Sequence, residues 1–161
     1  MKNIVAAVGG SLLRPEVQER QSWLEDLTVM VKEQISTGVK LGLVVGGGSP
    51  ARESIQLVKP IINDVLALDR IGIFATRLNA SIVKEVFQNS GIFVSEQIPK
   101  NVSEAVSLME KYDVVVMGGT IPGHTTDTVA IELAISSNSD KCIIATNVNK
   151  VYEEDPRNNK E

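Results

Sequence analysis

The sequence predicts an α/β domain, a three-layer α/β/α sandwich around a mainly parallel central sheet. Short apolar runs rich in Val and Ile alternate along the chain with longer amphipathic stretches. Such alternation is typical of parallel strands joined by covering helices. Three of the apolar runs lead directly into glycine-rich loops, and 161 residues with 43% hydrophobic content are enough for one core. We therefore expect a single domain over residues 1–161.

The first half of the chain predicts two strands, each followed by a helix. Residues 3–8 form an apolar run that stops at Gly9 and Gly10. The helix after Pro15 carries one apolar stripe, ends at Gly38 and presents Trp23, Leu24, Leu27, Met30, Val31 and Ile35. Residues 41–45 predict the second strand. Pro60 is expected to divide residues 51–67 into two shorter helices, because proline disrupts a helix interior.

The second half continues the alternation. We expect a helix over 72–89, a short third strand over 92–95, a helix over 102–111, a strand over 113–117, a helix over 126–136 and a final strand over 141–145. The helix over 126–136 is apolar nearly all round, which predicts deep packing. Cys142 has apolar neighbours and is expected to be a buried strand residue.

Composition excludes several classes of function. Lys and Arg number 16 against 20 Asp and Glu, and the formal net charge of -4 argues against a nucleic-acid partner. One Cys and one His exclude an internal disulfide and a metal-ligand cluster. No apolar run approaches the roughly 20 residues of a membrane span, and no leader pattern opens the chain. We expect a cytoplasmic protein without a membrane partner.

Glycine-rich loops at 9–11, 46–49 and 118–126 each follow a predicted strand. In a parallel sheet the carboxyl ends of the strands lie at one edge, where helix N-termini attract anions. A single such loop often serves only turn geometry. Three loops at one edge can line one crevice, and they favour a ligand with more than one phosphate. None matches the P-loop or the dinucleotide-binding fingerprint.

Five segments, in order, resemble the amino acid kinase family, and most closely its archaeal-type UMP kinases. They are residues 9–13, 44–52, 69–80, 118–127 and 146–156. The run from Gly118 to Asp127, Gly-Gly-Thr-Ile-Pro-Gly-His-Thr-Thr-Asp, is long and specific. The resemblance spans nearly the whole chain and implies the amino acid kinase fold.

The resemblance also implies an activity. A UMP kinase transfers the γ-phosphoryl group of ATP to UMP with Mg²⁺, giving UDP for pyrimidine nucleotide biosynthesis. It also implies a homo-oligomer, commonly a hexamer. Two alternatives stay open: a non-catalytic nucleotide-binding or subunit-forming module of the same fold, and a sister kinase with another small acceptor.

The site residues implied by the resemblance fall into three groups. Arg52 and Asp127 are the candidate catalytic residues. The candidate UMP-binding residues are Gly47, Asp69 at the ribose, and Thr120, Ile121, Pro122, Gly123, His124, Thr125 and Thr126 around the uracil and its phosphate. The candidate ATP-binding residues are Gly9, Gly10, Ser11, Gly48, Arg52, Thr146, Asn147, Tyr152 and Asp155. No protein side chain is expected to bind a metal.

Some of these residues also have purely structural interpretations. Asp127 at a helix start could cap the helix and interact favourably with the helix dipole, and Arg52 could be a solvated surface residue. His124 is interpreted as a positional loop residue. Arg77 could serve subunit packing or point toward the crevice, and we leave it outside the predicted site.

Three departures from the family pattern affect the ATP side. Ala7 occupies a position where many family members have lysine. Archaeal-type UMP kinases resemble this chain in lacking that lysine. Asn149 and Lys150 replace an Asp-Gly pair. The family continues beyond the Asp-Pro motif, whereas this sequence ends at Glu161. We therefore expect a complete acceptor-binding half and a nucleoside-triphosphate half that is truncated after about residue 157.

Overall fold

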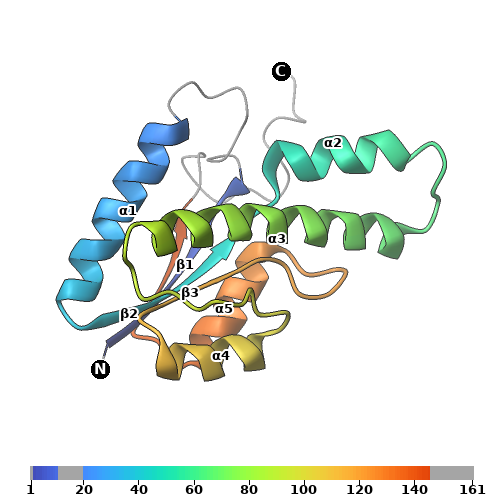
Figure 1. Ribbon diagram of the computed structural model, residues 1–161. Helices are drawn as coiled ribbons and strands as arrows, with labels where there is room; N and C mark the ends of the chain where they lie inside the picture. The colour runs from blue at the N-terminus through green and yellow to red at the C-terminus, as the bar shows by residue number, and fades with distance from the viewer. Residues whose placement is uncertain (1, 11–19, 146–161) are drawn as a thin grey trace, which may run out of the picture.

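Four parallel strands form the sheet of the computed structural model, which describes residues 2–10 and 20–145. They are β1 (Lys2–Val8), β2 (Val39–Val45), β3 (Val114–Met117) and β4 (Lys141–Ala145), in the spatial order β3-β2-β1-β4 (Figure 1). Every pairing in the sheet is parallel. The predicted α/β class and parallel sheet are therefore confirmed.

Helices cover both faces of this sheet. They are α1 (Arg20–Ser36), α2 (Gly48–Val58), α3 (Val65–Asn89), α4 (Val102–Lys111) and α5 (Thr126–Ser136). Helices α1 and α3 pack on one face, and α4 and α5 pack on the other. Figure 1 shows α3 running across the front of the sheet with α2 alongside it. None of the described helices combines the length and apolar character of a membrane span.

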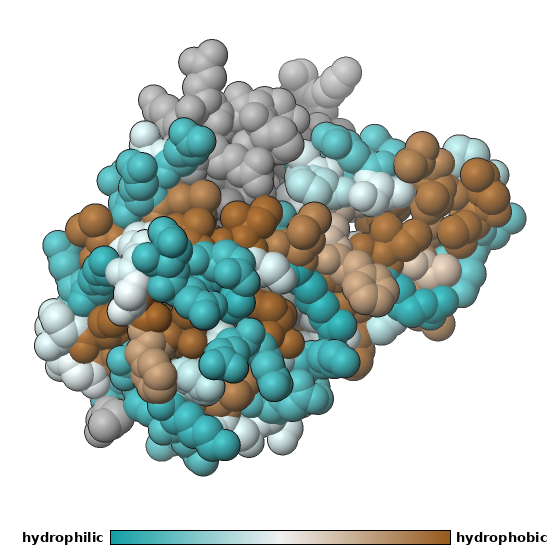
Figure 2. All heavy atoms as spheres, viewed as in Figure 1, coloured by the Kyte–Doolittle hydropathy of each residue, from teal (hydrophilic) through white to brown (hydrophobic). Residues whose placement is uncertain are grey.

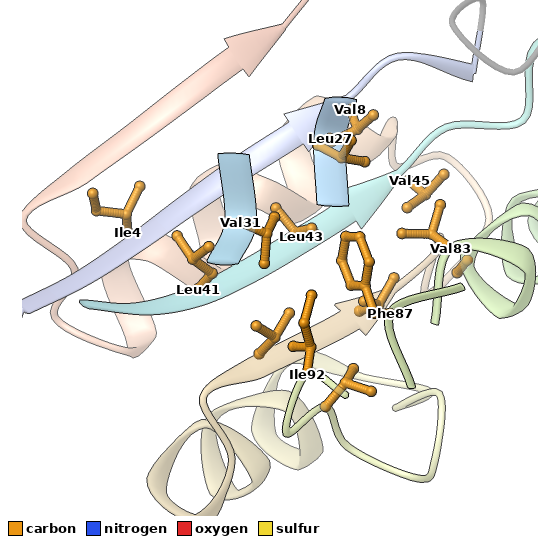
Figure 3. Packing of buried hydrophobic residues seen from close by; sticks show 14 of the residues in the cluster. Ile4, Val8, Leu27, Val31, Leu41, Leu43, Val45, Val83, Phe87 and Ile92 are labelled. Atoms are coloured by element: carbon orange, nitrogen blue, oxygen red, sulfur yellow. The ribbon is translucent and has the colours of Figure 1, made fainter. Parts of the chain in front are cut away.

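Alternation along the strands fills two apolar cores. Ile4 and Val8 of β1 join the cluster beneath α1 and α3, whereas Val5 and Ala7 join the cluster beneath α4 and α5. Figure 3 shows the first cluster, with Phe87 of α3 placed among the side chains of β2 and α1. Both faces of the inner strands are thus buried, as the unbroken apolar runs predict.

Pro60 separates two helices, but the second is not short. Helix α2 ends at Val58, and α3 is one continuous helix of 25 residues that includes the stretch between 67 and 72 left out of the prediction. The Asp64 side chain caps α3 by accepting a hydrogen bond from Leu66 N at 3.0 Å. Gly72 lies inside the helix. The helix tolerates it, because one glycine destabilises a helix by only about 1 kcal/mol relative to alanine.

The predicted strand over 92–95 is reduced to a single bridge between Val94 and Val114. Ser95 N donates to Val114 O at 3.0 Å, and Asp113 N donates to Phe93 O at 3.1 Å. The segment follows the β3 edge at this point and then turns toward α4, so it does not continue as a fifth strand.

The prediction that Cys142 is buried is wrong. Cys142 is exposed, because β4 is an edge strand that lies at the margin of the described helices.

The expectation of all-round packing for α5 is also wrong in part. Only one side of α5 packs against the sheet and α4, so Ile135 on its outer side is 75% exposed. Met30 of the predicted α1 stripe is likewise exposed.

Candidate functional site

A cavity of about 490 Å³ opens at the carboxyl edge of the sheet, where two chain connections diverge. The chain leaves β2 toward α2 and α3, and it leaves the neighbouring β3 toward α5 on the opposite face. Such a divergence between adjacent parallel strands creates a ligand crevice. The residues that line this cavity are Gly47, Gly48, Ala51, Arg52, Ile55, Asp69, Gly72, Ile73, Thr76, Gly119, Ile121, Pro122, Gly123, His124, Thr125 and Thr126.

The loops after β1 and β2 pack backbone against backbone. A Cβ atom on Gly10 would lie 2.6 Å from the carbonyl carbon of Gly47 and 2.7 Å from that of Gly46. Gly48 has a φ of +59°, and a Cβ atom there would lie 2.5 Å from the carbonyl carbon of Gly10. Only glycine allows both the left-handed backbone and this close approach. The Gly9–Gly10 pair therefore supports the loop that forms one wall of the cavity.

The N-terminus of α2 faces the cavity without a side-chain cap. Gly47 is the N-cap residue and offers no side chain, and the first N–H groups of any α-helix have no partner within the helix. The helix dipole adds positive potential at this end. Arg52, one turn further along, donates from its guanidinium to Ser49 Oγ at 3.3 Å. This wall of the cavity is suited to a phosphate group.

A buried amide on α3 fixes the loop from behind. Asn79 Nδ2 donates to Gly46 O at 2.8 Å and to Gly47 O at 3.0 Å. Asn79 is only 1% exposed, so these carbonyl groups are held by an amide that water does not reach. The sequence-based site did not include Asn79.

The opposite wall is the loop between β3 and α5, and α3 anchors it. Gly119 N donates to Thr76 Oγ1 at 2.6 Å, and the same hydroxyl donates to Ile73 O at 2.6 Å. Asp69 Oδ2 accepts from Gly123 N at 2.9 Å. The carboxylate predicted to contact a ribose thus holds the middle of the loop, and its second oxygen makes no hydrogen bond to a described residue.

The start of α5 carries the remaining polar groups. Thr125 is the N-cap residue, and its Oγ1 accepts from Thr128 N at 3.1 Å. His124 Nδ1 lies 3.3 Å from Glu132 Oε1 on the same helix. This contact orients the imidazole at the cavity wall.

Asp127 lies in the first turn of α5 and does not line the cavity. Thr125 supplies the cap, so Asp127 is not the cap residue, although its negative charge in the first turn still interacts favourably with the helix dipole. Partial burial raises the pKa of the Cys142 thiol above its ordinary value, and the negative charge of Asp127 raises it further. Helix α5 packs beside β4, which places the charge of Asp127 within electrostatic reach of Cys142.

The structure brings together most of the predicted acceptor site. Gly47, Arg52, Asp69 and the segment 121–126 line one cavity, joined by Gly48 from the predicted ATP group. Among the described residues, Thr120, Asp127, Gly9 and Gly10 do not line it. Outside the described residues lie Ser11, Thr146, Asn147, Tyr152 and Asp155.

Sequence reasoning missed the contribution of α3. Gly72, Ile73 and Thr76 line the cavity together with Asp69. Their spacing of three, four and seven residues from Asp69 places all four on one helical face. If the sequence had predicted one continuous helix through residue 69, this spacing would have pointed to all three residues. Ile55 of α2 and Ile73 of α3 add apolar surface to the cavity, which Ala51, Ile121 and Pro122 also line.

Within residues 2–10 and 20–145, no three His, Cys, Asp or Glu side chains gather as a metal-binding group. The donors at the cavity are instead backbone N–H groups, hydroxyl groups, the His124 imidazole and the Arg52 guanidinium. This set of groups suits an anionic ligand that carries its own metal ion.

Comparisons with known proteins agree with this geometry. The profile of the Amino acid kinase family matches residues 2–161. A uridylate kinase of Methanococcus vannielii is 37% identical over 157 residues, which are 98% of this chain and 68% of that protein. A uridylate kinase of Thermoplasma volcanium is also 37% identical, over 160 residues that are 99% of this chain and 67% of that protein.

Solved structures give the same result. The crystal structure of uridylate kinase from Archaeoglobus fulgidus superposes with a TM-score of 0.79 at 36% identity, covering 99% of this chain and 70% of that one. UMP kinase from Bacillus anthracis superposes with a TM-score of 0.74 at 24% identity and covers 98% and 70% of the two chains. The second likeness shows the fold alone.

Proposed function

The chain belongs to the amino acid kinase family, and we propose on this premise that it is a UMP kinase, which transfers the γ-phosphoryl group of ATP to UMP and gives UDP. One observation carries the proposal. The uncapped N-terminus of α2 and Arg52 form one wall of a cavity whose other wall contains Asp69 and the loop 119–126. A nucleoside monophosphate has complementary parts, since its phosphate suits the first wall and its sugar and base suit the second.

The acceptor needs little chemical activation. A phosphate monoester loses its second proton near pH 6, so UMP presents an ionised oxygen at neutral pH. Phosphoryl transfer then depends on holding two anions in line and stabilising charge on the transferred group. The N–H groups of Gly48 and Ser49 and the guanidinium of Arg52 serve that purpose. His124 is held by Glu132 and is not required as a base.

The ATP side begins at the two interlocked glycine loops. The backbones of Gly10 and Gly48 pack directly against each other, and we propose that Gly9, Gly10 and Gly48 bind the phosphates of ATP from the outer side of this contact. Asp127, near β4, is proposed to organise this side. Ser11, Thr146, Asn147, Tyr152 and Asp155 complete the proposed set from outside the described residues. Mg²⁺ would be carried by the ATP phosphates and would neutralise charge on them.

We further propose that the protein is a homo-oligomer, with a hexamer as the assembly implied by the resemblance. Exposed apolar side chains gather on an α2–α3 surface composed of Leu57, Ile61, Val65, Leu66, Phe74 and Leu78. Figure 2 shows apolar atoms over the outer ends of these two helices. Ile61 is 82% exposed and Phe74 is 66% exposed. An apolar surface of this kind supports contact with a second copy.

The test uses the 161-residue chain in two assays. Calorimetric titrations with UMP and with Mg·ATP measure binding, and a coupled assay on the same sample measures UDP. The Arg52→Ala variant tests the proposed phosphate-binding wall and should bind UMP more weakly than the parent protein. We expect binding of both ligands and UDP formation. UMP binding without UDP would support the alternative of a non-catalytic binding module, and no UMP binding would refute the proposed acceptor.

A further inference from the structure

Arg77 makes an unusual set of contacts for a helix residue beside a binding cavity. Its Nε donates to Gly119 O at 3.2 Å, and its terminal nitrogen Nη2 donates to Thr120 O at 3.4 Å and to Lys100 O at 3.3 Å. The guanidinium carbon also lies 6.0 Å from the centre of the Phe74 ring. One side chain thus connects α3 to two loops that are distant in sequence.

These contacts determine how two peptide groups are oriented. In a trans peptide, C=O and N–H point in opposite directions. Since Gly119 O and Thr120 O point toward the guanidinium, the N–H groups of Thr120 and Ile121 point away from it. Neither N–H group donates to a residue in the described part of the chain. Arg77 therefore leaves two adjacent backbone donors available in the loop that forms a cavity wall.

Arg77 itself does not line the cavity, although Gly119 and Ile121 do. From its place on α3, it holds the start of a loop whose middle is held by Asp69 through Gly123. Only a planar guanidinium offers several donors in a fixed fork, so lysine cannot reproduce the contacts.

We propose that Arg77 is a positioning residue for UMP, which acts through the backbone of Gly119 and Thr120 rather than by contact with the substrate. The proposal rests on the proposed function, because it names UMP as the ligand of the cavity. A loop fixed before binding loses less conformational freedom when the ligand arrives. The side chain thereby raises affinity for UMP and leaves affinity for ATP unchanged.

The test compares Arg77→Ala and Arg77→Lys with Arg70→Ala. Arg70 is a matched control because it lies on α3, carries the same charge and is largely exposed beside Asp64. Hydrogen exchange of residues 118–125 is measured first on the ligand-free protein. We expect both Arg77 variants to accelerate exchange at Gly119 and Gly123 at least tenfold, and Arg70→Ala to leave it unchanged.

Calorimetry then measures the two ligands separately. We expect Arg77→Ala and Arg77→Lys to raise the Kd for UMP at least tenfold, which is about 1.4 kcal/mol, with the Kd for Mg·ATP within twofold of the parent. Added methylguanidine should restore part of the UMP affinity of Arg77→Ala but not of Arg70→Ala. Unchanged exchange, or an equal loss for both ligands together with a lower melting temperature, would overturn the proposal. If the parent protein fails to bind UMP, the proposed function fails, and the exchange measurement still decides whether Arg77 holds the loop.

Discussion

The contact between the first two glycine loops can be tested by comparing Gly48→Ala with Gly38→Ala. Both glycines have left-handed backbones, with φ of +59° and +82°. A methyl group at Gly38 would meet no atom within 4 Å, whereas one at Gly48 would lie 2.5 Å from the carbonyl carbon of Gly10. The two variants therefore share the backbone cost and differ in the steric clash.

The expected magnitudes follow from these two terms. A left-handed conformation costs an alanine roughly 1–2 kcal/mol, and this is the whole effect expected at Gly38. Overpacking adds about 1–3 kcal/mol at Gly48, because the neighbouring Gly10 atoms are backbone and cannot rotate away. Gly48→Ala should thus lower the free energy of unfolding by about 2–5 kcal/mol, a large part of the roughly 5–15 kcal/mol typical of a domain.

Urea unfolding at 25 °C measures both values on one protein. Circular dichroism reports the helices, and the fluorescence of Trp23, the single tryptophan, reports packing beneath α1. Gly48→Ala should also weaken UMP binding, whereas Gly38→Ala should not, since Gly38 follows α1 away from the cavity. An equal loss of stability in the two variants would refute the close approach of the loops.

Three further substitutions test other parts of the site and surface. Arg52→Ala should weaken UMP binding about 10–100-fold with little change in the melting temperature, because it removes a charged donor from an exposed position and only one long hydrogen bond, to Ser49 Oγ; unchanged affinity by calorimetry would remove Arg52 from the site. Asp127→Asn should lower UDP formation at least tenfold with little change in melting temperature. It should also lower the pKa of Cys142, since the negative charge that raises this pKa is gone, and alkylation by iodoacetamide at pH 8.5 should accelerate; an unchanged alkylation rate would contradict the proximity. Phe74→Glu with Leu78→Glu should reduce the mass measured by light scattering, because charge on both residues opposes burial of the α2–α3 surface; an unchanged mass would place the subunit contact elsewhere.

Local signals account for the elements that were predicted within one residue. Helix α4 begins where Asn101 and Glu104 form reciprocal contacts: Asn101 Oδ1 accepts from Glu104 N, and Asn101 Nδ2 donates to Glu104 Oε1, each at 2.8 Å. Helix α5 begins at the Thr125 cap. Such signals lie within a few residues of each other, so the sequence alone reveals them.

Non-local facts account for the errors. The exposure of Cys142 depends on strand order, since the same apolar run would be buried in the middle of the sheet. The length of α3 depends on Gly72 being tolerated where the helix faces a cavity. The contacts of Arg77 likewise could not be predicted from its neighbours in the sequence, because its partners are carbonyl groups of residues 23 to 43 positions away.

The order of strands in the sheet also governs how the chain can fold. The inner strand β1 pairs with β2 about 37 residues later, but its other partner β4 lies 137 residues away, where Asn3 N donates to Asp140 Oδ2 at 3.0 Å. A pairing so distant in sequence carries a high loop-closure cost and forms late. During synthesis, one edge of β1 must wait until nearly the whole described chain has left the ribosome. We expect the β1–α1–β2 unit to form first and the β1–β4 ladder to complete the sheet.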